Sequence, residues 1–211
     1  MYITEKRLKR MKDVLSKRQK DLQVFSDNIT NPHNFSALLR TCDAVGVLNL
    51  YYRYLGEGEL INEEITMGSH KWVFYQEVED IDKFFKSKKE EGFQIVATYL
   101  SEDSVHFRQI DYTRPTLVVV GNEIHGVSGE VLKYADQQII IPMYGMAQSL
   151  NVSVATGVIL YEAQRQREEK GMYTRPTLTE EEMERIIKKW ATEDLIKHKM
   201  KESAIRHIKK L

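Results

Sequence analysis

Two polar side chains that could take part in chemistry, Asn34 and Arg40, lie in residues 31–46, N-P-H-N-F-S-A-L-L-R-T-C-D-A-V-G. If Asn34 caps a helix, its side chain and the free N–H groups of the first turn can meet an anion or a hydroxyl. Arg40 lies among apolar neighbours in the middle of that helix, so it needs a partner. The partner is either an anionic substrate or Asp43, three residues later, in a structural ion pair. Helix geometry leaves both interpretations open.

A second segment, residues 118–128, reads V-V-V-G-N-E-I-H-G-V-S. A continuous apolar run predicts a buried strand that ends in Gly-Asn-Glu and turns through Gly126 toward a helix. Ligands bind at the carboxyl ends of parallel strands, which places Asn122 and Glu123 well for contact with a substrate or cofactor. The alternative for Glu123 is a turn carboxylate that is stabilised by a helix N-terminus.

A third segment, residues 139–158, reads I-I-I-P-M-Y-G-M-A-Q-S-L-N-V-S-V-A-T-G-V. A strand stops at the proline, and a loop rich in glycine, methionine and small polar residues leads to a helix. Ser149 and Asn151 are candidate helix caps, which is their structural interpretation. A loop with Met143, Met146 and backbone amides would also suit an adenine ring and a sulfonium group.

Several common catalytic patterns are absent from the sequence. It contains no G-x-x-x-x-G-K-[ST] loop and no G-x-G-x-x-G after a strand, which argues against NTPase and Rossmann nucleotide sites. It also lacks the G-x-S-x-G and H-E-x-x-H patterns. The single cysteine, Cys42, excludes an intrachain disulfide and a cysteine-rich zinc site. We therefore expect no metal ion.

Alternating strands and helices must position the three segments. Hydrophobic periodicity predicts strands at residues 22–29, 47–55, 72–78, 94–100, 116–120 and 138–141. It predicts helices at residues 4–20, 34–45, 80–91, 127–135, 151–169 and 179–210. This alternation is typical of an α/β fold with a mostly parallel sheet flanked by helices. We expect a core at residues 21–170, with helical extensions at residues 1–20 and 171–211.

The net charge of zero conceals an uneven distribution. Residues 1–20 hold eight Lys or Arg against two acidic residues, residues 185–211 hold nine against three, and the remainder is acidic. Basic ends on an acidic body favour a nucleic-acid partner over two merely solvated helices. The candidate RNA contacts are Lys6, Arg7, Lys9, Arg10, Lys17 and Arg18. With no signal peptide and no apolar run long enough to cross a membrane, we expect a cytoplasmic protein.

The three segments, in this order, resemble motifs 1, 2 and 3 of the SpoU/TrmH branch of the SPOUT methyltransferases. The matching runs are N-F-S-A-L-L-R-T-C-D-A-V-G, G-N-E-I-H-G-V-S and I-P-M-Y-G-M-A-Q-S-L-N-V-S-V-A. The resemblance extends over about residues 20–170. It implies a deep trefoil knot, a feature almost absent from other proteins, and a homodimer formed through the knot region.

The resemblance also implies an activity, the transfer of a methyl group from S-adenosylmethionine to a ribose 2′-hydroxyl in RNA. The short basic extensions favour guanosine 18 in the D-loop of tRNA as the target. The alternatives are a ribosomal-RNA 2′-O-methyltransferase and a non-catalytic RNA-binding protein of the same fold. The residues implied to bind the cofactor are Leu100, Gly121, Asn122, Gly126, Ile141, Met143 and Leu150.

By the same resemblance, the catalytic residues are Arg40, Asn34, Glu123, Ser149 and Asn151. The family assigns activation of the 2′-hydroxyl to the residue that matches Arg40, but arginine is normally a permanent cation. We therefore expect Arg40 to contact the hydroxyl and the adjacent phosphate and to stabilise the developing alkoxide. Asn34 would orient the ribose or Arg40, and Glu123 would organise the pocket. Ser149 and Asn151 would hold Arg40, the substrate or the knot.

Overall fold

The computed structural model of the protein describes residues 4–58, 60–61, 63–122 and 125–192. Within these residues, seven strands form one sheet in the order β3-β2-β1-β6-β4-β7-β5, and every pair of neighbours is parallel. The strands are β1 Leu22–Ile29, β2 Asn49–Tyr54, β3 Phe74–Glu77, β4 Gln94–Thr98, β5 Val105–His106, β6 Thr116–Val120 and β7 Gln137–Ile140. The predicted α/β fold with a mostly parallel sheet is confirmed.

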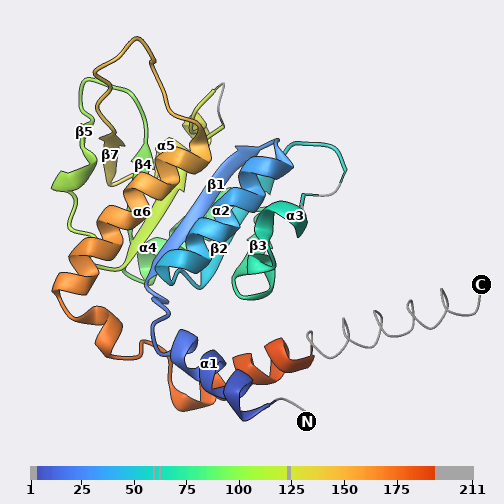
Figure 1. The fold of residues 1–211 in the computed structure, drawn as a ribbon. Coiled ribbons are helices and arrows are strands. Elements are labelled where there is room, and N and C mark those ends of the chain that lie inside the picture. Colours follow the sequence, from blue (N-terminus) through green and yellow to red (C-terminus); the bar gives the residue numbers. More distant parts are fainter. Residues whose placement is uncertain (1–3, 59, 62, 123–124, 193–211) are drawn as a thin grey trace, which may run out of the picture.

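Helices cover both faces of the sheet (Figure 1). On one face, α2 (Pro32–Val45) and α6 (Val152–Glu169) pack over β1, β2 and β6 in a core that includes Phe35, Leu39 and Ile159. On the other face, α4 (Ile81–Glu90) and α5 (Gly129–Leu132) pack in a second core around Phe25 and Phe85. Burial on both faces explains the continuous apolar run of β6, in which all five residues are buried.

The two extensions pack against each other at the amino ends of the strands. Helix α1 (Glu5–Leu15) and the helical residues 180–192 lie side by side below the sheet (Figure 1). Their contact is a third apolar cluster that contains Met11, Leu15, Leu48, Leu178, Ile186, Ile187 and Trp190. The predicted cap of this segment is confirmed, since Thr179 and Glu182 exchange backbone-to-side-chain hydrogen bonds of 2.8 and 3.2 Å. The rest of the helix expected at residues 179–210 lies outside the described residues.

Shorter elements complete the described chain. Helix α3 (Glu63–Thr66) follows β2, and single 3-10 turns lie at Ser69–Lys71, Phe107–Gln109 and Met172–Thr174. Along these residues, no helix is long and apolar enough to cross a membrane.

The predicted bounds agree best where strands are buried on both faces. Strands β1 and β6 have the predicted limits, whereas the strand expected at residues 72–78 is shortened to β3. Strand β5 was not predicted, because two residues are too few to show a periodicity. The helix expected at residues 127–135 keeps only the single turn of α5, because the residues before it close a tight loop.

The start of α2 differs from the prediction. Asn31, and not Asn34, is the N-cap: its side-chain oxygen accepts a hydrogen bond of 2.9 Å from the backbone N–H of His33. Pro32 occupies the first helical position, where its fixed φ and missing N–H are tolerated. Asn34 therefore lies within the first turn. The predicted C-terminal cap, Gly46, is confirmed, since it has a φ of 85°.

Arg18, which we expected to contact RNA, is instead a structural residue. Its exposed fraction is 0%, and its guanidinium forms an ion pair with Asp43. It also donates hydrogen bonds of 3.1 Å to the carbonyl oxygens of Val47 and Trp72. A buried guanidinium needs such partners, and they leave it unavailable to RNA. The side chain therefore connects the segment after α1 to the sheet core.

The burial of Arg18 generates a stability prediction. Arg18→Ala should lower the free energy of unfolding by about 3 kcal/mol, because the Asp43 carboxylate and three carbonyl oxygens lose their donor. Urea denaturation would measure the change. Lys17→Ala is the control, since Lys17 is an exposed neighbour and should change stability by less than about 0.5 kcal/mol. Equal stability of the two variants would contradict the structural role of Arg18.

Candidate active site at the carboxyl ends of the strands

The loops that follow β4, β6 and β7 emerge at one end of the sheet, next to the start of α6 (Figure 1). They correspond to residues 99–104, 121–128 and 141–151. Because all strands are parallel, their carboxyl ends meet at this edge, which is where ligands bind in open α/β sheets. The second and third chemically promising segments of the sequence therefore lie at the same edge.

The loop after β6 is closed on itself at Gly121 and Gly126. The backbone N–H of Asn122 donates to the carbonyl oxygen of Gly126 at 3.0 Å, and the reverse bond measures 2.8 Å. A Cβ atom on Gly121 would lie 2.0 Å from the carbonyl carbon of Gly126, so no side chain fits there. Gly126 has a φ of +67°, a conformation that favours glycine. Both glycines are thus required by the shape of the loop.

Asn122 anchors this loop to the end of β1. Its side-chain nitrogen donates a hydrogen bond of 3.0 Å to the carbonyl oxygen of Asn28, which itself adopts a positive φ of 53°. Its side-chain oxygen accepts from the backbone N–H of His125 at 3.4 Å. The side chain of Asn122 therefore holds the loop in place, and its contact with a cofactor stays a prediction. Glu123, which follows, lies outside the described residues.

The first and third segments are joined by a pair of asparagines. The side-chain nitrogen of Asn151 donates a hydrogen bond of 3.1 Å to the side-chain oxygen of Asn34, which is buried. The side-chain oxygen of Asn151 caps α6 by accepting from the backbone N–H of Ser153 at 2.9 Å. The starts of α2 and α6 are therefore held together, although 117 residues separate the two asparagines.

Arg40 and Ser149 do not contact the Asn34–Asn151 pair through any hydrogen bond between the described residues. Arg40 is exposed on α2, and among the described residues none forms a hydrogen bond or ion pair with it. Asp43, the structural partner that helix spacing allowed, is bound to Arg18 instead. Ser149 is exposed in the loop before α6. Of the two interpretations of Arg40, the structural ion pair with Asp43 is wrong, and a role in contacting a substrate remains.

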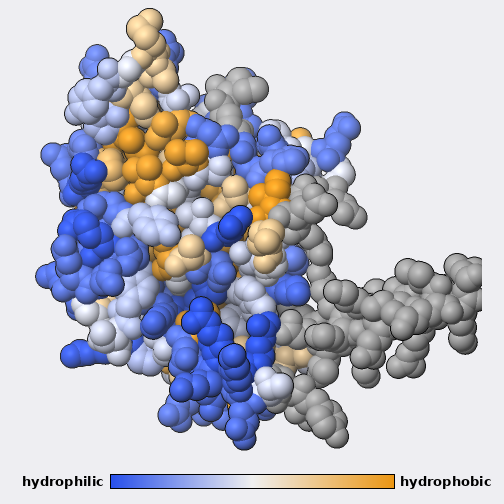
Figure 2. All heavy atoms as spheres, viewed as in Figure 1, coloured by the Kyte–Doolittle hydropathy of each residue, from blue (hydrophilic) through white to orange (hydrophobic). Residues whose placement is uncertain are grey.

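The residues expected to hold the cofactor offer an apolar surface at this edge. Ile141, Met143 and Leu150 are half-buried, whereas Leu100 has an exposed fraction of 80%. Figure 2 shows apolar side chains gathered over the first half of α6 and the neighbouring loops. An adenine ring needs such a surface together with nearby backbone groups, so the residues present fit the expected cofactor.

One polar cluster beneath the site was not predicted. Asp27, at the end of β1, is fully buried, and its carboxylate accepts from the backbone N–H of Ser128 at 2.8 Å. Arg53, from β2, donates to Asp27 at 2.8 Å and to Glu130 at 2.7 Å. Burial lowers the pKa of Arg53, but the hydrogen bond to Glu130 and the charge of Asp27 outweigh this, and the pKa is raised. An acidic residue inside an apolar strand was the signal that could have revealed this cluster.

Two other types of chemistry find no support at the site. Cys42 is buried in α2, and burial raises the pKa of its thiol well above the usual range, so it cannot act as a nucleophile. Across the residues that the structure describes, no cluster of His, Cys, Asp or Glu could hold a metal ion.

Comparisons with known proteins match nearly the whole chain. The SpoU rRNA Methylase family model matches residues 21–161, and the model of the SpoU rRNA methylase C-terminal region matches residues 165–201. The chain is 65% identical over 199 residues to the tRNA (guanosine(18)-2′-O)-methyltransferase of Aquifex aeolicus strain VF5. That match covers 93% of this chain and 94% of the relative.

Two solved structures are also similar. The crystal structure of the Aquifex aeolicus TrmH/SpoU tRNA modifying enzyme superposes with a TM-score of 0.86 and 66% identity, and covers 90% of this chain and 97% of that one. The structure of an AdoMet-bound rRNA methyltransferase from Sinorhizobium meliloti gives a TM-score of 0.64 and 31% identity. This second match covers 74% of this chain and 59% of the other.

The closed loop after β6 generates a prediction for Gly121, with a second glycine as control. Gly121→Ala should lower the free energy of unfolding by more than about 2 kcal/mol, because the new methyl group meets backbone that cannot move aside. Gly129→Ala is the control, since a Cβ there meets nothing within 4 Å. Chemical denaturation would measure stability, and titration calorimetry the affinity for S-adenosylmethionine, which Gly121→Ala should weaken strongly. Wild-type behaviour of Gly121→Ala in both assays would refute the role of the close approach.

Proposed function

The chain belongs to the SpoU methylase family, and we propose that it methylates the ribose 2′-hydroxyl of guanosine 18 in tRNA, with S-adenosylmethionine as methyl donor. The observation that carries this function is the 65% identity to a tRNA (guanosine(18)-2′-O)-methyltransferase along almost the full length of both chains. Identity to the ribosomal-RNA enzyme is 31% and covers 59% of that chain, which favours tRNA over ribosomal RNA. Such an enzyme works where tRNA is processed, which favours the cytoplasm.

The cofactor site proposed here consists of the loops after β4, β6 and β7. S-adenosylmethionine, when bound, supplies the electrophilic methyl group. Leu100, Ile141, Met143 and Leu150 would enclose the adenosine, and the backbone of residues 121–126 would approach it closely because Gly121 carries no side chain. We also propose that these loops form the deep trefoil knot of the family.

The catalytic side chains act by positioning and by charge. Arg40 is an exposed cation with no partner among the described residues, so it can grip a backbone phosphate and the neighbouring hydroxyl of RNA. A positive charge at that point favours the alkoxide that attacks the methyl group. The Asn34–Asn151 pair holds α2, which carries Arg40, against the cofactor loop. Correct placement of both reactants then contributes much of the rate.

The basic side chains of α1 support an RNA contact outside the catalytic edge. Lys6, Arg7, Lys9 and Arg10 are exposed on this helix, and Lys17 is exposed just after it. The guanidinium of Arg7 lies 5.0 Å from the ring of Trp72, which orients it at the surface. Because residues 21–184 carry an excess of acidic residues, the phosphate backbone of tRNA should bind to these basic residues instead.

A homodimer would cover an apolar stripe on α6. Val154, Val158 and Tyr161 have exposed fractions of 52%, 37% and 55%, and their spacing places them on one face of the helix. Figure 2 shows an apolar surface over the first half of α6, beside the proposed cofactor loops. Exposed patches of this kind commonly mark protein interfaces. Dimerisation there could bring Arg40 of one subunit to the cofactor of the other.

The dimer can be tested by placing a charge in the stripe. Val158→Asp should convert the dimer to a monomer, because a carboxylate would be buried without a partner. Ser87→Asp, at an exposed position of α4 on the other face of the sheet, adds the same charge and should leave the dimer intact. Sedimentation velocity would report both masses. A monomeric wild-type protein, or a dimeric Val158→Asp variant, would refute an interface on this face.

Arg40 provides the sharpest test of the catalytic mechanism. Arg40→Ala should lower kcat on tRNA by about a hundredfold or more, while the melting temperature and the affinity for S-adenosylmethionine stay unchanged. Arg40→Lys should not restore activity, because lysine lacks the planar fork that binds two oxygen atoms at once. The assay would use tRNA and ribosomal RNA in parallel, which also tests the substrate. Full activity in folded Arg40→Ala would exclude a catalytic role.

A further inference from the structure

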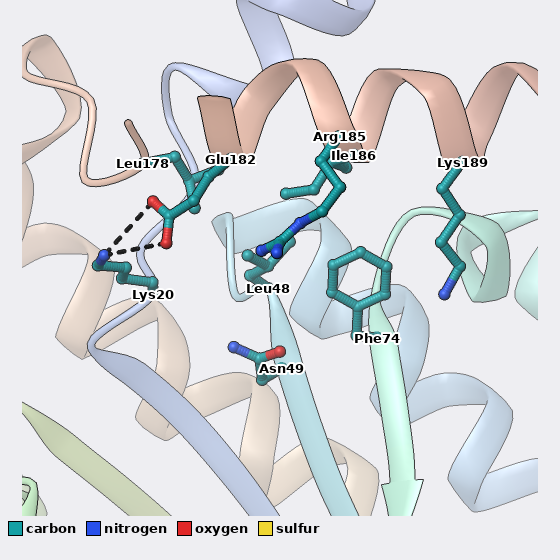
Figure 3. A pocket seen from close by; sticks show the side chains of 9 residues that line it. All are labelled: Lys20, Leu48, Asn49, Phe74, Leu178, Glu182, Arg185, Ile186 and Lys189. Carbon is teal, nitrogen blue, oxygen red and sulfur yellow. Dashed lines mark hydrogen bonds and ion pairs between the residues drawn. The ribbon is translucent and has the colours of Figure 1, made fainter. Parts of the chain in front are cut away.

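A groove with charged walls lies at the opposite end of the sheet from the proposed catalytic edge. It has a volume of about 430 Å³ and lies between the helical residues 180–192 and the first residues of β2 and β3 (Figure 3). Asn49 and Phe74 line it from the strands, and Arg185 and Lys189 line it from the helix. Strand β2 spans six residues, so the groove lies about 17 Å or more from the catalytic edge.

Positive charge exceeds negative charge in this groove. Lys20, Arg185 and Lys189 face a single carboxylate, that of Glu182. The Nζ atom of Lys20 lies 3.4 Å from this carboxylate, which pairs the two. A hydrogen bond from the backbone N–H of Thr179 lowers the pKa of Glu182, so the carboxylate stays ionised and continues to neutralise Lys20. The charge of Arg185 also acts on Glu182, so three cations share one carboxylate and the lining of the groove keeps an excess of positive charge.

Arg185 and Lys189 both lie over apolar side chains. The Nζ atom of Lys189 lies 4.5 Å from the centre of the Phe74 ring, a cation–π contact. The side chain of Arg185 reaches from the helix into the groove beside Leu48, toward Asn49 (Figure 3). Within the described part of the chain, its guanidinium has no hydrogen-bond or ion-pair partner. Because Leu48 and Ile186 are buried beneath it, the guanidinium lies over an apolar floor that strengthens its attraction for an anion.

We propose that this groove binds a backbone phosphate of the tRNA substrate at a nucleotide remote from the methylated ribose. Arg185 grips the phosphate, Lys189 adds charge beside it, and Asn49 forms a hydrogen bond with the adjacent ribose or base. A polyanion is the expected occupant, because the groove belongs to the same structural unit as α1, whose exposed side chains are also mostly basic. This inference rests on the proposed function.

The test is the tRNA dependence of methylation by full-length Arg185→Ala. KM for tRNA should rise about tenfold with kcat unchanged, because the contact is remote from the reacting atoms. The slope of log affinity against log salt concentration should fall by about one phosphate contact. Arg185→Lys should recover the salt slope, since it restores the charge, but only part of the affinity.

Lys188→Ala is the matched control. Lys188 is an exposed cation of the same helical segment and does not line the groove, so its loss should change KM by less than about twofold. Melting temperatures of all variants should equal that of the wild type. An Arg185→Ala enzyme with wild-type KM and salt slope would overturn the proposal that the groove binds a phosphate of tRNA. A Lys188→Ala enzyme that is as impaired as Arg185→Ala would also overturn it. A wild-type protein that fails to methylate tRNA would overturn the proposed function instead.

Discussion

The parallel direction of every strand in the described sheet is the constraint on which the other features depend. A parallel pair cannot be joined by a tight turn, so each connection crosses a face of the sheet, and helices cover both faces. The carboxyl ends of β1, β4, β6 and β7 consequently meet at one edge. The amino ends meet at the other edge, where α1 and residues 180–192 form their own apolar cluster. The proposed catalytic site and the proposed tRNA-binding surface can thus lie at opposite ends of the same sheet.

Polar contacts hold the loops of the proposed catalytic edge from below and from the side. Asp27 is the central contact: it is fully buried, it binds the backbone of Ser128, and Arg53 neutralises it. Removal of either partner would leave a buried charge, so the cluster resists rearrangement of the loop after β6. The Asn34–Asn151 bond has the same effect between α2 and α6. A site built in this way pays little reorganisation energy when its ligands bind.

Arginine has two opposite uses in this fold, and exposure separates them. Arg18 and Arg167 have exposed fractions of 0% and connect distant segments through carboxylates and carbonyl oxygens. Arg167, for example, donates 2.6 Å to Asp21 and 2.9 Å to the carbonyl oxygen of Tyr112. Arg40 and Arg185 are exposed and have no such partners among the described residues. Only cations of the second kind can attract RNA, although all four share the same chemistry.

The sequence by itself determined the α/β class, the limits of β1 and β6 and the family, because periodicity and motif order are local properties of the chain. It could not distinguish Arg18 from its exposed neighbour Lys17, since burial depends on contacts with Asp43 and Trp72, far away in the sequence. The N-cap of α2 is Asn31 and not the predicted Asn34, because Pro32 fixes the φ of the first helical residue. The Asn34–Asn151 pair, the Asp27–Arg53 cluster and the groove at Arg185 were decided only by the tertiary structure, because each joins segments that meet through packing of the whole sheet.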